Sequence, residues 1–199
     1  MDANAIAPQT TRAVADAVKA GAGFTDGGII GPPPQPGSPG GPRLYLSGQG
    51  AAEVAALFDG TPVRTEPVDG GIGAASAVKM AYSAWTKGTA ALVLAARALA
   101  RAEQVEGTLL AEWALSQPDL GRRTESAAQS AAAKGWRWDA EMIQIATAMA
   151  DAGLPDGFHQ AAAQLYRCAP RADPAALGDS APGDVVELVL EALNGEHLA

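Results

Sequence analysis

The feature that most constrains the fold is a long segment rich in alanine and leucine, residues 73–103, which contains no proline. Its residues favour helix, and Gly88 is the weak point within it. At roughly 1.5 Å per residue, the segment predicts a helix about 45 Å long, well above the ~11-residue average. A helix of this length usually joins two domains or forms a subunit interface.

The sequences before and after this segment are of different kinds. Pro8 opens a predicted first helix that Gly21 and Gly23 end. Three extended stretches follow, separated by a proline-rich loop, PPPQPGSPGGP, and a short helix, AAEVAALF; they are FTDGGII, RLYLSG and PVRTEPV. This part predicts mixed α/β structure.

Helices dominate the second part. Breaks at glycine and proline predict helices near residues 106–116, 119–133, 138–152 and 156–168. A linker at 170–182 then leads to an amphipathic helix near 184–193, and the pattern leaves open whether this helix packs on its own chain or on a partner. The fold class that we expect is mostly α with a partial α/β region.

Charge and composition exclude several classes of partner. The 199-residue chain has a formal net charge of −8 and no run of basic residues, which argues against binding nucleic acid or an anionic membrane. The N-terminus does not resemble a targeting segment, and Arg97 interrupts the longest apolar run. We therefore expect a cytoplasmic protein.

The cysteine and histidine content argues against a disulfide or a metal site. Cys168 is the single cysteine, and His159 and His197 are the two histidines, too few for a zinc constellation. We expect Cys168 to be a small core residue and His159 to be an ordinary helix residue.

Lys79 lies in the first turns of the long predicted helix and has two interpretations. Lys79, Lys87, Arg97 and Arg101 fall within one sector of about 80°, at 100° per residue, which favours a stripe of solvated charges. On the opposite side of this helix the pattern gathers apolar residues, namely Val78, Trp85, Leu92 and Leu99. Alternatively, the lysine is functional. A cation near a helix N-terminus is disfavoured by the positive end of the helix dipole, so its presence there suggests a functional reason. Its neighbours Ala75, Ser76, Tyr82 and Ser83 are small or hydroxylic, which would leave room for a ligand.

Two short motifs overlap this region. GIGAAS imitates the G-x-G-x-x-G turn of dinucleotide-binding folds, but a very long helix follows it instead of a βαβ crossover. Ser76 to Lys79 spells S-x-x-K without the partner motifs of serine acyltransferases. Both matches are better explained by chance than by a phosphate cradle or a nucleophile.

Three motifs in order resemble the β-hydroxyacid dehydrogenases, the family of 3-hydroxyisobutyrate and 6-phosphogluconate dehydrogenases. They are DANAIAP at residues 2–8, DGGIIG at residues 26–31, and a G-x-x-G turn, Gly70 to Gly73, six residues before Lys79. These look like the family's D-x-S-T-x-x-P segment, its D-A-P-V-S-G substrate loop and its catalytic lysine. The likeness covers roughly residues 2–168 and is strongest to the 6-phosphogluconate-dehydrogenase-like subgroup.

The resemblance implies a role for individual residues. Lys79 would be the acid/base group at the substrate oxygen, and Asn4 and Gly73 would approach an NAD or NADP cofactor, with NADP favoured. The implied substrate-binding residues are Asp26, Gly28, Ile30, Gly31, Tyr82 and Ser83. Residues 1–70 would be the end of a Rossmann-type domain, 71–169 a helical domain and 170–199 a linker with a tail helix.

The chain also departs from the family pattern. Ile30 replaces a serine of the substrate loop, Ser83 replaces an asparagine, and Glu141 and Met142 replace a Lys-Asp pair. These changes favour a less acidic, bulkier or imine-like substrate. Trp136, Arg137 and Trp138 could line its pocket, although tryptophans in a helical domain are more often core or interface residues. The family's true G-x-G-x-x-G would precede residue 1, so we expect the main cofactor-binding half to be missing.

Two functions remain open at this stage. One is the C-terminal half of an NAD(P)-dependent oxidoreductase acting on a small hydroxy acid, alcohol or imine. The other is a non-catalytic helical module for dimerisation or binding. For both we expect a homodimer, because the alanine-rich faces of the long helix permit close approach of a second copy.

Overall fold

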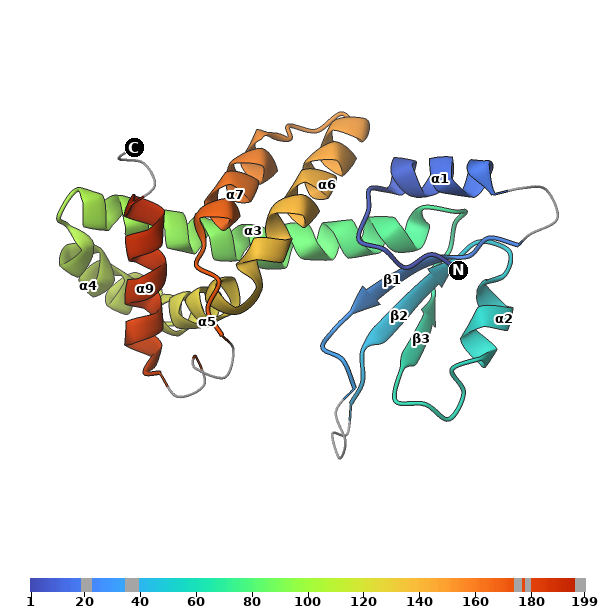
Figure 1. Ribbon diagram of the computed structural model, residues 1–199, viewed down its shortest axis with the longest axis horizontal. Helices are drawn as coiled ribbons and strands as arrows, with labels where there is room; N and C mark the ends of the chain where they lie inside the picture. Colours follow the sequence, from blue (N-terminus) through green and yellow to red (C-terminus); the bar gives the residue numbers. More distant parts are fainter. Residues whose placement is uncertain (19–22, 35–39, 174–176, 178–179, 196–199) are drawn as a thin grey trace. The chain divides into compact units, whose positions relative to one another are not determined.

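The computed structural model describes residues 1–18, 23–34, 40–173, 177 and 180–195 (Figure 1). The chain divides into two compact units, one of Met1–Ser83 with Gln144–Asp156 and the other of Ala84–Ile143 with Gly157–Ala199. The predicted helix end at Gly21, the middle of the proline-rich loop and His197 lie outside the described residues.

The first unit contains a three-stranded mixed sheet. Its strands are β1 (Asp26–Ile30), β2 (Arg43–Ser47) and β3 (Arg64–Pro67), in the order β1-β2-β3. Strand β1 is antiparallel to β2, with Gly28 opposite Tyr45, and β2 is parallel to β3. Helices α1 (Pro8–Ala17) and α2 (Ala51–Ala56) belong to the same unit. The three extended stretches predicted from the sequence are therefore the three strands.

The long helix α3 spans Ala74–Ala102, 29 residues, and the boundary between the two units falls within it. A series of helices follows α3, as the breaks at glycine and proline predict. These are α4 (Glu106–Ser116), α5 (Leu120–Lys134), the 3-10 helix η1 (Gly135–Arg137), α6 (Trp138–Asp151), α7 (Gly157–Cys168) and α9 (Pro182–Gly195). The mostly helical fold class with a small sheet near the N-terminus is confirmed.

The tail helix α9 packs on its own chain. Its apolar face, including Val185, Val189 and Leu190, is buried and lies mainly against α5. The buried side of α5 is mostly alanine, and Ala128 and Ala131 are fully buried. Small residues let the two helices approach closely, so α9 completes the core of the second unit.

The charged stripe on α3 is not solvated, contrary to one interpretation of the sequence. In the second unit, Lys87 pairs with Glu141, and Arg97 and Arg101 pair with Glu106. The three cationic side chains are only 12 to 25% exposed. The predicted apolar side is the exposed one, since Trp85, Leu92 and Leu99 are 67, 56 and 65% exposed. The assignment of the two sides was therefore wrong in this unit, because the neighbouring helices supply carboxylates to the cations.

One smaller expectation, that Cys168 is a core residue, is wrong. Cys168 is half-buried at the end of α7 and is not a core residue. His159 on α7, in contrast, is 7% exposed and belongs to the interior of the second unit. Within the described part of the chain, no helix is both long enough and apolar enough to cross a membrane.

Candidate functional site

The candidate site forms where strand β1 meets the first turns of α3. Gly28 of β1 is buried, and a Cβ atom added to it would lie 2.7 Å from the Ala75 carbonyl oxygen and 3.1 Å from Cβ of Lys79. The first distance is shorter than real Cβ contacts, so a side chain at position 28 would displace the helix or the strand. The close approach requires glycine. The structure thus brings together two of the predicted site residues, Gly28 and Lys79.

A buried carboxylate holds the start of α3 against the sheet. Asp26 is fully buried, and its Oδ2 accepts hydrogen bonds from the Ser47 hydroxyl at 3.0 Å and from the amides of Gly73 and Ser76 at 2.9 and 3.0 Å. Its Oδ1 accepts one from the Ser76 hydroxyl at 2.6 Å. A negative charge is favourable at a helix N-terminus, and four hydrogen bonds compensate its burial. Asp26 therefore anchors the helix that carries Lys79, and both of its oxygens face protein groups.

The hydroxyls of Ser47 and Thr11 extend this network. The Ser47 hydroxyl accepts a hydrogen bond from the Ala75 amide at 3.0 Å, and the hydroxyls of Ser76 and Thr11 are 2.9 Å apart. Neither Ser47 nor Thr11 belongs to the three motifs. No sequence motif marks these two residues. The only signal in the sequence is the general preference for hydroxyl and carboxylate acceptors at the start of a helix.

The amides that follow the glycine turn, at the start of α3, are bonded within the protein. The amides of Gly73, Ala75 and Ser76 donate to Asp26 or Ser47, and that of Ala74 donates to the Gly71 carbonyl. Phosphate-binding turns instead direct such N–H groups at the ligand. Gly73 has φ +99, and an added Cβ would lie 3.2 Å from the Pro8 carbonyl oxygen, so close packing accounts for this glycine.

The other predicted site residues lie in different environments. Ile30 and Ser83 are 2 and 1% exposed, so both side chains are interior, whereas Tyr82 is 46% exposed. Gly31 follows β1 with φ +113, a conformation that favours glycine. Asn4 is exposed, and its backbone and side-chain nitrogens both donate to the Asp2 carboxylate, at 2.9 and 2.7 Å. The sequence suggested room beside Lys79, but Ala75, Ser76 and Ser83 are buried.

A cavity of about 370 Å³ lies beside the glycine turn in the first unit. Residues from the glycine turn, the first turn of α1 and the end of α6 line it, including Gly73, Arg12 and Asp151. Lys79 does not line this cavity. The pair that replaces the family's Lys-Asp lies in the second unit, where Glu141 pairs with Lys87 and Met142 is fully buried.

Comparison with known proteins gives the following relatives. A family model described as a domain of unknown function (DUF1932) matches residues 100–168. The conserved hypothetical protein from Sinorhizobium meliloti 1021 is 25% identical, with a TM-score of 0.72 over 96% of this chain and 65% of its own. The conserved protein MTH1747, whose structure is reported to resemble 3-hydroxyacid dehydrogenases, is 22% identical, with a TM-score of 0.59 over 100% of this chain and 67% of its own. A search of curated protein sequences finds no significant match.

These similarities concern the fold. The chain shares the architecture of a protein that resembles 3-hydroxyacid dehydrogenases, and it spans less than two thirds of the length of the Sinorhizobium protein. The matched family domain covers the helical part from the end of α3 to the end of α7.

Proposed function

We propose that the chain is the C-terminal, substrate-binding and dimerising portion of an NAD(P)-dependent oxidoreductase of the β-hydroxyacid dehydrogenase type. Lys79 is its acid/base residue, and the 6-phosphogluconate-dehydrogenase-like subgroup is the nearest kind of enzyme. The observation that carries this proposal is the contact between Gly28 and Lys79. The DGGIIG segment, which corresponds to the substrate loop, lies against the helix turn of the lysine that would act on the same substrate.

The chemistry assigned to Lys79 is a proton transfer. In oxidation of an alcohol, the neutral amine accepts the proton of the substrate hydroxyl as the C–H hydrogen leaves as hydride; in reduction, the ammonium returns a proton to the oxygen or nitrogen. The nicotinamide ring supplies the hydride acceptor or donor when a cofactor is bound. Asp26 supports this step as a positioning residue, because it fixes the first turn of α3 on the sheet.

The amides of Gly73, Ala75 and Ser76 at the start of α3 donate to Asp26 and Ser47, so they are not directed at a phosphate group. We therefore assign the cofactor, with NADP favoured over NAD, mainly to a nucleotide-binding domain outside these 199 residues. In this proposal, Asn4 and Gly73 are the residues of this chain that approach the cofactor.

The substrate is assigned as a small hydroxy acid, alcohol or imine. Ile30, at the place of the family's serine, is buried and offers no hydrogen bond to a carboxylate. Glu141 and Met142 supply no cation, which also weakens recognition of an acidic substrate. Tyr82, 46% exposed and one turn from Lys79, is the side chain best placed to contact a bulkier group.

We also propose a homodimer built on the helical unit. Leu99 and Leu115 are 65 and 83% exposed, and large exposed apolar side chains often mark subunit contacts. No nucleic acid or membrane partner is proposed, in keeping with the net charge of −8.

The proposed function is tested by placing a nicotinamide-binding domain of this enzyme type before residue 1. The joined protein is expected to consume NADPH or NADH with a small carbonyl or imine substrate, whereas the 199-residue chain alone is expected to bind neither cofactor in calorimetry. A joined protein that binds the cofactor normally but turns over no substrate of these classes would instead favour the non-catalytic module.

A further inference from the structure

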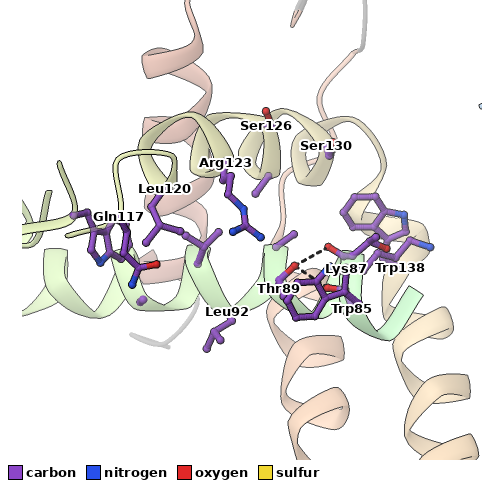
Figure 2. Close-up of a pocket in the computed structure, with 16 residues that line it drawn as sticks. Trp85, Lys87, Thr89, Leu92, Gln117, Leu120, Arg123, Ser126, Ser130 and Trp138 are labelled. Atoms are coloured by element: carbon purple, nitrogen blue, oxygen red, sulfur yellow. Dashed lines mark hydrogen bonds between the residues drawn. The ribbon is translucent and has the colours of Figure 1, made fainter. Parts of the chain in front are cut away.

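The second unit contains a large cavity that is separate from the residues of the candidate site. Its volume is about 840 Å³, within the range of roughly 300–1,000 Å³ that is usual for small-molecule sites. Helices α3, α4 and α5 and the start of α6 contribute its walls (Figure 2). Lys79 and the predicted substrate- and cofactor-binding residues do not line it, whereas Trp138, which the sequence suggested as a pocket residue, does.

Most of the wall is apolar and aromatic. Three of the four tryptophans of the chain, Trp85, Trp113 and Trp138, line the cavity together with Leu92 and Val93. Trp138 is held in place, since its ring meets that of Tyr166 edge to face with centroids 5.1 Å apart, and the Tyr166 hydroxyl donates to the Lys87 carbonyl at 2.6 Å. Such a wall suits the apolar or aromatic body of a ligand.

Two cations line the cavity: Lys87 has a carboxylate partner, whereas Arg123, an exposed residue of α5, has none among the described residues. Lys87 pairs with Glu141 and lies 5.6 Å from the centre of the Trp138 ring. Arg123 extends from α5 into the cavity, and its guanidinium makes no hydrogen bond or ion pair with any residue that the structure describes (Figure 2). No described carboxylate lines the cavity. The walls therefore present a net charge of one positive unit in a chain that carries −8 overall.

We propose that this cavity binds an organic monoanion, a carboxylate on an aromatic or branched aliphatic body. The carboxylate pairs with the Arg123 guanidinium, whose fork of N–H donors matches two carboxylate oxygens. The apolar body lies against Trp85, Trp113 and Trp138. Hydroxyl groups of Ser126 and Ser130, on the same helix as Arg123, line the cavity and add polar contacts. The site is independent of Lys79 and of the proposed redox reaction.

The test is titration of the purified chain with 4-phenylbutyrate and with its neutral analogue 4-phenylbutyramide, by calorimetry and by tryptophan fluorescence. The acid is expected to bind saturably at one site per chain and roughly tenfold or more tighter than the amide, because the amide lacks the charge that pairs with Arg123. Arg123→Gln is expected to lower the affinity for the acid by a similar factor and to leave the affinity for the amide almost unchanged.

Arg122→Gln is the matched control. Arg122 is the preceding residue of α5, does not line the cavity and pairs with Asp119 at 3.2 Å on the surface. Arg122→Gln removes the same charge outside the cavity, so it should change the affinity for the acid by no more than about twofold. Ser130→Phe, which fills the cavity from the wall, should abolish binding of both compounds while circular dichroism still reports a folded helical chain.

Several results would overturn the proposal. They are the absence of saturable binding, equal affinity for acid and amide, or equal losses with Arg122→Gln and Arg123→Gln. If the unaltered chain binds neither compound and Ser130→Phe changes the oligomeric mass, the cavity is instead a contact between protein chains.

Discussion

The backbone of Gly28 lies against Cβ of Lys79, so close that an added Cβ on the glycine would be 3.1 Å from that atom and 2.7 Å from the Ala75 carbonyl oxygen. We predict that Gly28→Ala lowers the free energy of unfolding by about 1–3 kcal/mol, the usual cost of overpacking. Urea denaturation measures it. Gly23→Ala is the control, because an added Cβ at Gly23 meets nothing within 4 Å. Equal effects of the two substitutions would contradict the close contact.

Asp26→Asn tests the anchor of α3. The asparagine side chain keeps one oxygen but turns an NH₂ group toward donors, the Ser47 hydroxyl or the amides of Gly73 and Ser76. Because these groups are buried, we expect a loss of about 2–4 kcal/mol in the free energy of unfolding. Asp16→Asn, an exposed position on α1, should stay within about 0.5 kcal/mol. A loss below 0.5 kcal/mol at Asp26 would mean that the carboxylate does not hold the helix.

His159 makes the stability of the second unit depend on pH. Burial lowers its pKa below the ordinary value of 6.5, and a hydrogen bond to the backbone of Ala84 opposes part of that shift. Its Nδ1 is buried without a hydrogen-bond partner among the described residues, so the charged ring would add an unsatisfied donor. The unfolded chain then binds a proton more readily than the folded chain. The stability that neutral His159 contributes is thus fully present above pH 6.5 and falls as the pH drops toward the lower, folded pKa.

His159→Gln isolates this effect. The difference in unfolding free energy between the original chain and the variant should shrink as the pH falls from 8 to 5. Denaturant unfolding at several pH values measures the difference, in which the contributions of other groups cancel. A difference that is constant over this range would show that the pKa of His159 is not lowered in the folded protein.

Leu99→Glu tests the proposed homodimer. Leu99 is 65% exposed on α3, so a charge there should leave the fold of a single chain intact. At a subunit contact, the same charge would be buried without a partner and should weaken dimerisation by roughly tenfold or more. Light scattering coupled to gel filtration gives the mass. An unaltered chain with a mass of 20.1 kDa at micromolar concentration would refute the dimer.

Much of the fold followed from local sequence. The absence of proline from 73–103 and the glycine and proline breaks beyond it predicted α3 to α7 with ends within one or two residues. The side of α3 that is buried could not be predicted, because it depends on Glu106 and Glu141 from other helices. A stripe of cations has the same pattern whether water or carboxylates face it.

The proximity of two of the predicted site residues also followed from the sequence. The motif spacing singled out Gly28 and Lys79, which the structure brings together. It also singled out Asp26 as a substrate residue, whereas the structure shows its carboxylate bound to Ser47, Gly73 and Ser76. Those partners come from segments far apart in the sequence, and one chain without its fold does not indicate which of them meet. Lys79 as acid/base residue stays a prediction.

The most direct test of the central claim is the turnover of the joined protein, a nicotinamide-binding domain followed by residues 1–199, with Lys79→Met. Methionine keeps the length of the side chain and removes the proton, so we expect kcat to fall by about 10²- to 10⁴-fold. Lys134→Met, at an exposed position on α5, is the control and should leave kcat within a few-fold. An unchanged kcat in Lys79→Met, or equal losses in both variants, would contradict the assignment of Lys79 as the acid/base residue.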